Sequence, residues 1–181
     1  KDSFIYPCQL LVRIHPQAVT GKYSDDINGM LQYQSDSVMF DFPKIITGKI
    51  PFDLPKNDMV HLKEIIYYSD VTINPNSTLS IDAAILDKPI INIGFDGYTE
   101  VPLHKSVRRV HNYTHYKNIV NTGGVRIADT IDDFVKITND YLGKSNLDSE
   151  NRKRIVEEQC YKTDGMSSKR IANRILEIMK V

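Results

Sequence analysis

The sequence predicts an α/β fold with a mostly parallel sheet, because short apolar strands alternate with helices along most of the chain. Runs such as Pro89–Ile93 (PIINI) are too short for helices and are rich in β-branched residues. Segments with apolar residues at helical spacing separate these runs, and the links between them are short. Short links of this kind are typical of strand–helix–strand crossovers. We therefore expect a single Rossmann-like three-layer domain over residues 1–181.

The first third of the chain gives a weaker pattern than the rest. Residues 9–14 (QLLVRI) form a candidate buried strand that ends at His15-Pro16. Residues 17–57 are expected to be irregular, with one short strand at 37–42, because prolines and polar runs interrupt any longer pattern.

The pattern sharpens after residue 57. In chain order we expect a helix from Asp58 to about 69, a strand at 71–73, a helix capped by Ser77 or Thr78, a strand at 89–93, a short helix at 114–120, a strand at 125–128, a helix from Thr130 to Gly143, and two final helices near 148–160 and 167–180. Asp133 stands three residues after Thr130, in the position of a capping box. The last helix repeats apolar residues at helical spacing, which predicts that it docks on the domain.

Composition favours an ordinary globular protein. The 181 residues carry no formal net charge at pH 7, so the overall field favours no particular partner. Cys8 and Cys160 lie far apart with no CxxC spacing, which argues against a zinc site and against a disulfide scaffold. No apolar run approaches the roughly 20 residues of a membrane span, and no signal peptide is recognisable. We expect a cytoplasmic domain that belongs to a longer protein.

The stretch Asn74-Pro75-Asn76-Ser77-Thr78, between a strand and a helix, is the first candidate site. Ligands of open parallel sheets bind at the carboxyl ends of the strands. A helix that starts at Ser77 or Thr78 directs unpaired N–H groups and its positive dipole end toward this edge. We expect Asn76, Ser77 and Thr78 to bind a phosphate, and Asp82, one turn later, to bind ribose hydroxyls. The alternative is that the two hydroxyls only cap the helix and that Asp82 is a solvated helix residue.

His15, at the end of the first strand, is the second candidate. A protonated imidazole there would attract a phosphate. The alternative is a surface histidine with a local hydrogen bond.

A basic segment, residues 101–128, is the third candidate, because it carries five Lys or Arg, three His and no Asp or Glu. Arg108 and Arg109 are its best phosphate ligands, since a guanidinium binds oxyanions through two parallel hydrogen bonds. The segment would face a pyrophosphate, an anionic acceptor or a membrane surface; the alternative is a solvated loop. Nucleic acid is a poor candidate, because the segment is short and no recognition motif accompanies it.

These motifs together resemble a known family. His15-Pro16 after an apolar strand, Tyr68-Ser69-Asp70, the run 77–84 (STLSIDAA) and Lys88-Pro89-Ile90-Ile91 are similar to the C-terminal nucleotide-binding half of GT-B type glycosyltransferases. The nearest branches are CDP-glycerol glycerophosphotransferases, capsule and polysialyl transferases, and UDP-N-acetylglucosamine 2-epimerases. The resemblance covers about residues 9–16 and 58–175.

The resemblance implies a donor site for a UDP-linked or a CDP- or CMP-linked substrate. His15 would contact the donor phosphates, Ser77 and Thr78 would hold the phosphate, and Asp82 would bind the ribose. We expect no cofactor and predict no metal-binding residue. The sequence has no DxD motif and many transferases of this fold act without a metal, so metal dependence is left open. The resemblance places the general base in an N-terminal domain that the 181 residues lack. Asn74-Pro75-Asn76 departs from the glycine-rich turn of the family, and Asp82 replaces a common glutamate. These departures leave the nucleobase and the sugar open.

The leading functional hypothesis is the donor-binding half of a glycosyltransferase or glycerophosphotransferase of surface polysaccharide biosynthesis, cytoplasmic or peripheral to the membrane, and inactive by itself. Two alternatives remain: a UDP-sugar 2-epimerase relative and a non-catalytic Rossmann-like interaction module.

Overall fold

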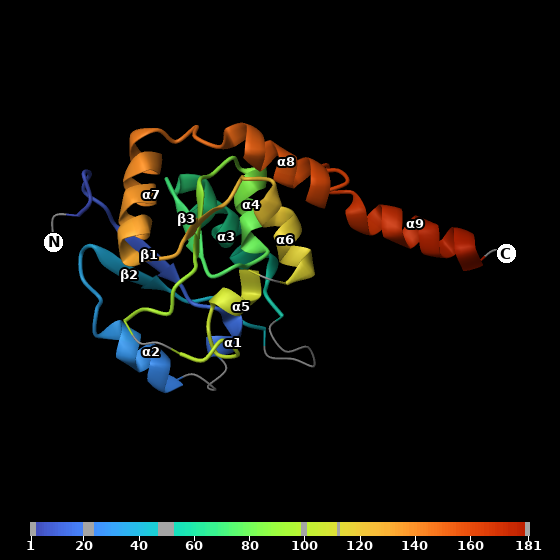
Figure 1. Cartoon of the computed structure of the whole chain (residues 1–181). Coiled ribbons are helices and arrows are strands. Elements are labelled where there is room, and N and C mark those ends of the chain that lie inside the picture. Colours follow the sequence, from blue (N-terminus) through green and yellow to red (C-terminus); the bar gives the residue numbers. More distant parts are fainter. Residues whose placement is uncertain (1–2, 20–23, 47–52, 99–100, 112, 180–181) are drawn as a thin grey trace. The chain divides into compact units, whose positions relative to one another are not determined.

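The computed structural model describes residues 3–19, 24–46, 53–98, 101–111 and 113–179. The chain divides into two compact units, residues 1–65 and 66–181, and each contains its own parallel sheet (Figure 1). Parallel strands joined by helices confirm the predicted α/β, Rossmann-like class. That residues 1–181 form a single domain stays a prediction.

The unit of residues 1–65 is built on two parallel strands. Strand β1 (Leu10–Arg13) pairs with β2 (Val38–Asp41), so both strands predicted in this region are confirmed. Helix α1 (Pro16–Val19) and helix α2 (Ser24–Leu31) connect them. The expectation of an irregular segment at 17–57 was wrong for α2, a helix whose sequence has only three large apolar residues, Ile27, Met30 and Leu31. β1 was also expected to be buried, yet Leu10 and Leu11 are 45% and 38% exposed.

Helix α3 (Lys56–Tyr68) begins two residues before the predicted cap, Asp58. Asp58 is buried and accepts hydrogen bonds from Arg13 Nη2 at 2.5 Å and from the Lys44 N–H at 2.8 Å. Arg13 also pairs with Asp41. Burial alone would raise the pKa of Asp58, but the two hydrogen bonds and the charge of Arg13 bring it below its usual value. Asp58 therefore holds β1 to α3 and is not a helix cap.

The unit of residues 66–181 contains a three-stranded sheet in the order β3-β4-β5. Strands β3 (Thr72–Asn74), β4 (Ile90–Ile93) and β5 (Arg126–Ala128) agree with the predicted strands to within about one residue. Ile73 pairs with Ile91, and Ile91 pairs with Arg126. The connection from β3 to β4 contains helix α4 (Leu79–Ile85), and the connection from β4 to β5 contains helices α5 (Arg108–His111) and α6 (Thr114–Asn121).

Helices cover both faces of this sheet (Figure 1). On one face Ile91 and Ala128 pack with Tyr141 of α7 (Ile131–Gly143) in the hydrophobic core. On the other face Asn92 accepts a hydrogen bond from the Tyr116 hydroxyl of α6, and this hydroxyl also lies 2.9 Å from Ser80 Oγ of α4. The α7 cap is as predicted, since the Thr130 hydroxyl oxygen accepts a hydrogen bond from the Asp133 N–H at 3.0 Å.

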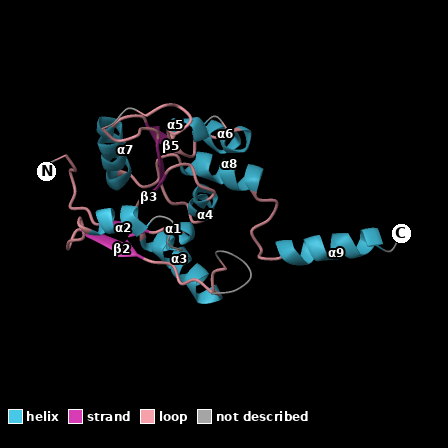
Figure 2. Ribbon diagram, turned by 90° about the horizontal axis from the view of Figure 1, so that it is seen from below, coloured by secondary structure: helices cyan, strands magenta, loops and turns pink. Residues whose placement is uncertain are grey.

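Helix α8 (Ser149–Gln159) packs along α4, and the two lie side by side with α6 in Figures 1 and 2. The fully buried Arg152 stabilises this contact. Its guanidinium donates to the Asp87 carboxylate at 2.8 Å and to the carbonyls of Leu147 and Ser145. Gly124 is required beside α8, because a Cβ there would lie 2.8 Å from the Asn151 carbonyl oxygen.

Helix α9 (Ser167–Met179) confirms the last predicted helix but not its predicted docking. None of its described residues is buried, and its apolar side chains are more than half exposed. Helical spacing of apolar residues shows that a helix has an apolar side, but it does not tell what covers that side.

Candidate functional site

The turn after β3 brings the predicted phosphate-binding residues to the carboxyl edge of the sheet. The Ser77 N–H donates to Asn74 Oδ1 at 2.8 Å, and the Leu79 N–H donates to Ser77 Oγ at 3.2 Å. Thr78 occupies the cap position, but its side chain makes no capping hydrogen bond. Ser77 therefore does cap the first turn of α4 locally, while Thr78 does not.

Asn76 has the left-handed backbone conformation, with φ of 70°. Asparagine tolerates this conformation better than most residues with a Cβ. This explains how Asn74-Pro75-Asn76 replaces a glycine-rich turn without losing the sharp change of direction.

A buried polar network lies behind the turn and joins two strands to two helices. It consists of Asn74 (β3), Asn92 (β4), Ser80 (α4) and Tyr116 (α6), all of which are 5% exposed or less. Asn92 Nδ2 donates to Asn74 Oδ1 at 3.0 Å, and the Tyr116 hydroxyl donates to Asn92 Oδ1 at 2.6 Å. Ser80 Oγ lies 2.9 Å from the Tyr116 hydroxyl and accepts from Asn74 Nδ2 at 3.2 Å.

This network fixes the position of the turn, because Asn74 Oδ1 also binds the Ser77 N–H. Burial raises the pKa of Tyr116, while its hydrogen bonds with Ser80 and Asn92 oppose that rise. The phenol therefore stays protonated and continues to donate to Asn92. Sequence reasoning missed these residues, although one signal was present: an asparagine flanked by isoleucines in a buried strand needs a polar partner.

The loop after β4 ties the basic segment to the same edge of the sheet. Asp96 accepts hydrogen bonds from Ser106 Oγ at 2.6 Å and from the Val107 N–H at 2.7 Å. These two bonds, with a smaller contribution from Arg108, lower the pKa of Asp96. Gly94 allows the loop to leave β4, since a Cβ there would lie 2.7 Å from Asp129 Oδ1. α5 therefore begins at a position fixed by the carboxyl end of β4.

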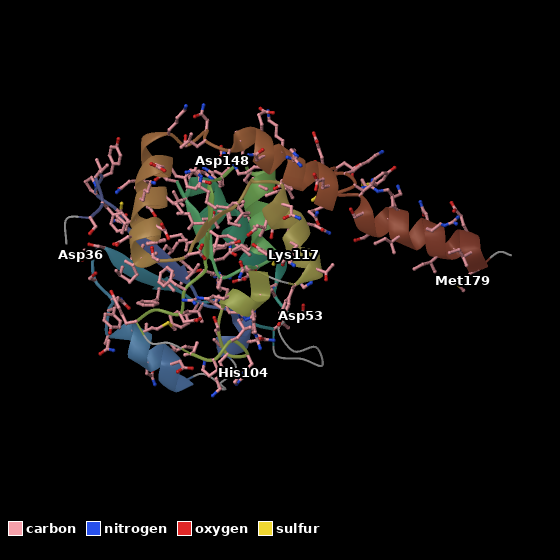
Figure 3. The ribbon with its side chains drawn as sticks, in the orientation of Figure 1. Asp36, Asp53, His104, Lys117, Asp148 and Met179 are labelled. Carbon is pink, nitrogen blue, oxygen red and sulfur yellow. The ribbon has the colours of Figure 1, made fainter. Side chains whose placement is uncertain are left out.

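Arg108 and Arg109, the predicted phosphate ligands, are the first two residues of α5, and both are exposed. Arg109 Nη1 donates to the carbonyl of His104, which Figure 3 labels in the loop before α5, at 2.6 Å. For Arg108, the bond described is from its backbone N–H to Ser106 Oγ at 3.0 Å. Since β3 and β4 are parallel neighbours, the turn at Ser77 and the Asp96 loop leave the same edge of the sheet, and Asp96 bonds to Val107, the residue before Arg108.

Asp82 lies on the exposed surface of α4. Partial desolvation raises its pKa. Burial, and to a smaller extent the negative charge of Asp82, raises the pKa of Cys160, the residue that follows α8. The carboxylate of Asp82 is therefore close to the C-terminal end of α8. None of the hydrogen bonds described for this part of the chain joins Asp82 to Ser77 or Thr78, and its ribose contact stays a prediction.

His15 belongs to the other unit and stands just before α1. It is exposed, and its Nδ1 accepts a hydrogen bond from the Gln17 N–H at 3.1 Å. In the neutral ring this bond leaves the proton on Nε2. The alternative stated for a surface histidine, a local hydrogen bond, is therefore present, and a phosphate contact at Nε2 stays a prediction.

Among the described residues, no group of three or more His, Cys, Asp or Glu side chains is placed to hold a metal ion. Nor does any helix in the described ranges have the length and apolar character needed to cross a membrane.

Comparison with known proteins identifies a family. A family model described as CDP-glycerol:poly(glycerophosphate) glycerophosphotransferase matches residues 8–177. No curated protein and no solved structure matches the chain. The matched range includes both sheets, the turn at Ser77 and the basic segment, and it confirms the resemblance drawn from the sequence. The chain therefore belongs to the CDP-glycerol:poly(glycerophosphate) glycerophosphotransferase family, whose members are transferases of polymer biosynthesis.

Proposed function

We propose that this chain carries the donor-binding part of a glycerophosphotransferase and that its donor is CDP-glycerol. The observation that carries the proposal is the family match over residues 8–177, because the reaction in the family description needs a CDP-glycerol donor. The carboxyl edge of the β3-β4-β5 sheet supports it, since this is where open parallel sheets bind ligands.

Thr78 is the proposed contact for the diphosphate in the turn. The N–H groups of Ser77, Leu79, Ser80 and Ile81 already donate within the protein. By contrast, no hydrogen bond is described for the N–H or the hydroxyl of Thr78, which is an exposed residue of the described range. Thr78 therefore offers two donors at a point where the buried network holds the backbone still. Ser77 serves this arrangement as the local cap of α4.

Arg108 is the proposed second contact. Its backbone is held by Ser106, and Asp96 fixes the segment before it. A guanidinium can bind two oxygens of a phosphate at once. A positive charge at this edge would stabilise the negative charge that develops on the leaving nucleotide.

The reaction supported by this arrangement is a phosphoryl transfer. The acceptor hydroxyl attacks the phosphorus that bears the glycerol, and a new P–O bond forms. The bond from that phosphorus to the bridging oxygen breaks, and CMP leaves with the electron pair. The acceptor proton passes to a general base, which we expect from an N-terminal domain outside the 181 residues.

Calorimetric titration of the chain tests the proposal. CDP-glycerol, CMP and UDP-N-acetylglucosamine are titrated into the wild type and into Thr78→Val, Arg108→Ala and His15→Ala. Thr163→Val, in the exposed link before α9, is the matched control. We expect CDP-glycerol and CMP to bind in preference to the UDP-sugar, and Thr78→Val to weaken binding roughly tenfold, the equivalent of about 1.4 kcal/mol. Tighter binding of the UDP-sugar, or equal affinity of Thr78→Val and Thr163→Val, would contradict the proposal.

A further inference from the structure

The arginines of this chain differ in whether they meet a carboxylate. The sequence has eight, and six of them form ion pairs with Asp or Glu: Arg13, Arg126, Arg152, Arg154, Arg170 and Arg174. Among the described residues, no ion pair involves Arg108 or Arg109, which stand side by side at the start of α5. Asp96, whose pKa Arg108 helps to lower, takes its hydrogen bonds from Ser106 and Val107 instead.

Further basic side chains accompany these two arginines, and together they form a basic patch that we call the α5–α6 surface. It consists of His104, Lys105, Arg108, Arg109, His115 and Lys117, all of them exposed. α5 and α6 contact each other, and Figure 3 labels His104 in the loop before α5 and Lys117 on α6. Residues 101–128, which carry the patch, include no Asp or Glu, so this segment does not neutralise its own positive charge.

The α5–α6 surface begins at the edge of the sheet that carries the proposed donor contacts. The Tyr116 hydroxyl, from the first turn of α6, lies 2.9 Å from Ser80 Oγ in the first turn of α4. Ser80 comes two residues after Thr78, and Lys117 directly follows Tyr116. The loop before α5 leaves the carboxyl end of β4 at the same edge. A ligand bound on this surface would therefore continue from the donor site.

The packing of α6 and the number of charges identify the class of ligand. Tyr116 and Ile119 of α6 are buried, so this helix lacks the wide apolar side with which interfacial helices enter a lipid surface. Several cations spread along two helices suit a ligand with many negative charges better than a single phosphate. The family description names such a ligand, poly(glycerophosphate), which carries a phosphodiester charge in every repeat.

We propose that the α5–α6 surface binds the anionic acceptor polymer, at repeats behind the hydroxyl that accepts the new unit. Lys105, Arg109 and Lys117 contact phosphates of different repeats, while Arg108 serves the donor. Each contact is weak because it is exposed to solvent, but the contacts act together because one polymer connects the phosphates. This role rests on the proposed function, since the acceptor is taken to be the polymer of the family description, but it uses other side chains than the donor site.

Calorimetric titration of the full 181-residue chain tests the proposal. The ligands are an oligomer of about ten glycerophosphate units, glycerol 3-phosphate as the single unit, and CDP-glycerol. The test variant is Lys105→Gln/Lys117→Gln, which removes two charges from the α5–α6 surface. The matched control, Lys136→Gln/Lys144→Gln, removes two exposed charges from α7 and its C-cap, on the opposite face of the sheet.

We expect the wild type to bind the oligomer at least about tenfold more tightly than glycerol 3-phosphate, and less tightly at about 0.5 M salt. Lys105→Gln/Lys117→Gln should weaken oligomer binding about fivefold, since each exposed ion pair contributes little. The control variant should change it less than about twofold. Both variants should bind CDP-glycerol as the wild type does.

Four results would overturn the proposal. The first is an oligomer that binds no more tightly than glycerol 3-phosphate. The second is an equal loss in the two variants, which would show an effect of overall charge. The third is an oligothymidylate with the same number of phosphates that binds more tightly than the oligomer, which would assign the surface to nucleic acid. The fourth is binding of phosphatidylglycerol vesicles to the wild type but not to Lys105→Gln/Lys117→Gln, which would assign it to lipid.

The titration with CDP-glycerol separates this surface from the donor site. A wild type that binds the oligomer as expected but does not bind CDP-glycerol would refute the donor site and leave the α5–α6 surface in place. A wild type that binds CDP-glycerol but not the oligomer would refute the α5–α6 surface alone.

Discussion

Removal of one hydroxyl, in Tyr116→Phe, tests whether the buried network stabilises the turn at the carboxyl edge of the sheet. The Tyr116 side chain is 1% exposed. Its hydroxyl donates to Asn92 Oδ1 at 2.6 Å and lies 2.9 Å from Ser80 Oγ. Phenylalanine fills the same space, so the substitution removes hydrogen bonds and creates almost no cavity.

The magnitude follows from what the substitution leaves behind. Asn92 Oδ1 loses the donor described for it and stays buried, and an unsatisfied buried acceptor costs about 1–3 kcal/mol. Ser80 Oγ keeps a partner in Asn74, so its share of the loss is smaller. We expect Tyr116→Phe to lower the free energy of unfolding by about 2 kcal/mol.

Urea denaturation followed by circular dichroism measures this change, with Tyr113→Phe as the control. Tyr113 lies three residues earlier, is 42% exposed and makes no side-chain capping bond. Its substitution should change the free energy of unfolding by less than about 0.5 kcal/mol. If both variants unfold at the same urea concentration with the same denaturant slope, the reasoning about the network is refuted.

Three further predictions concern single groups. Gly94→Ala should lower the free energy of unfolding by roughly 2 kcal/mol, because its Cβ would lie 2.8 Å from Ile127 Cγ2 and 3.0 Å from the Ala128 carbonyl oxygen, and an unchanged thermal midpoint would contradict this. Arg152→Met should lower the free energy of unfolding by about 3 kcal/mol. Methionine has a volume similar to that of the fully buried Arg152, but it leaves the carbonyls of Leu147 and Ser145 without their donor; urea denaturation measures the loss. The pKa of Asp164 is lowered from 3.8 to about 2, chiefly by its hydrogen bonds with Arg170. The stabilisation from this pair is therefore complete above about pH 4 and is lost as the pH falls through about 2. NMR titration should find the low pKa in the wild type and a higher pKa, still below 3.8, in Arg170→Ala, because the Met166 N–H continues to donate to Asp164.

Much of the second unit could be predicted from the sequence because its signals are local. β4 follows from a short β-branched run after Pro89, and α7 follows from Thr130 with Asp133 three residues later. The fold class follows from the alternation of such elements. The candidate turn also follows, since a strand end, a hydroxyl pair and a helix start are neighbours in the sequence.

The remainder depends on pairs distant in the sequence. Asp58 has the sequence features of a cap but pairs with Arg13, 45 residues earlier, and this depends on how α3 meets β1. Tyr116 meets Asn92 across 24 residues, through a crossover whose path the sequence does not specify. α2 carries too few apolar residues for its periodicity to stand out.

The central claim is that the carboxyl edge of the β3-β4-β5 sheet binds the diphosphate of CDP-glycerol. The most direct test is to record the backbone amide resonances of the chain by NMR during a titration with CDP-glycerol. The account predicts that the largest shifts occur at residues 76–79 and 106–109, with small shifts in α7 and α9. Saturating shifts confined to other segments, or no shifts at millimolar CDP-glycerol, would contradict it.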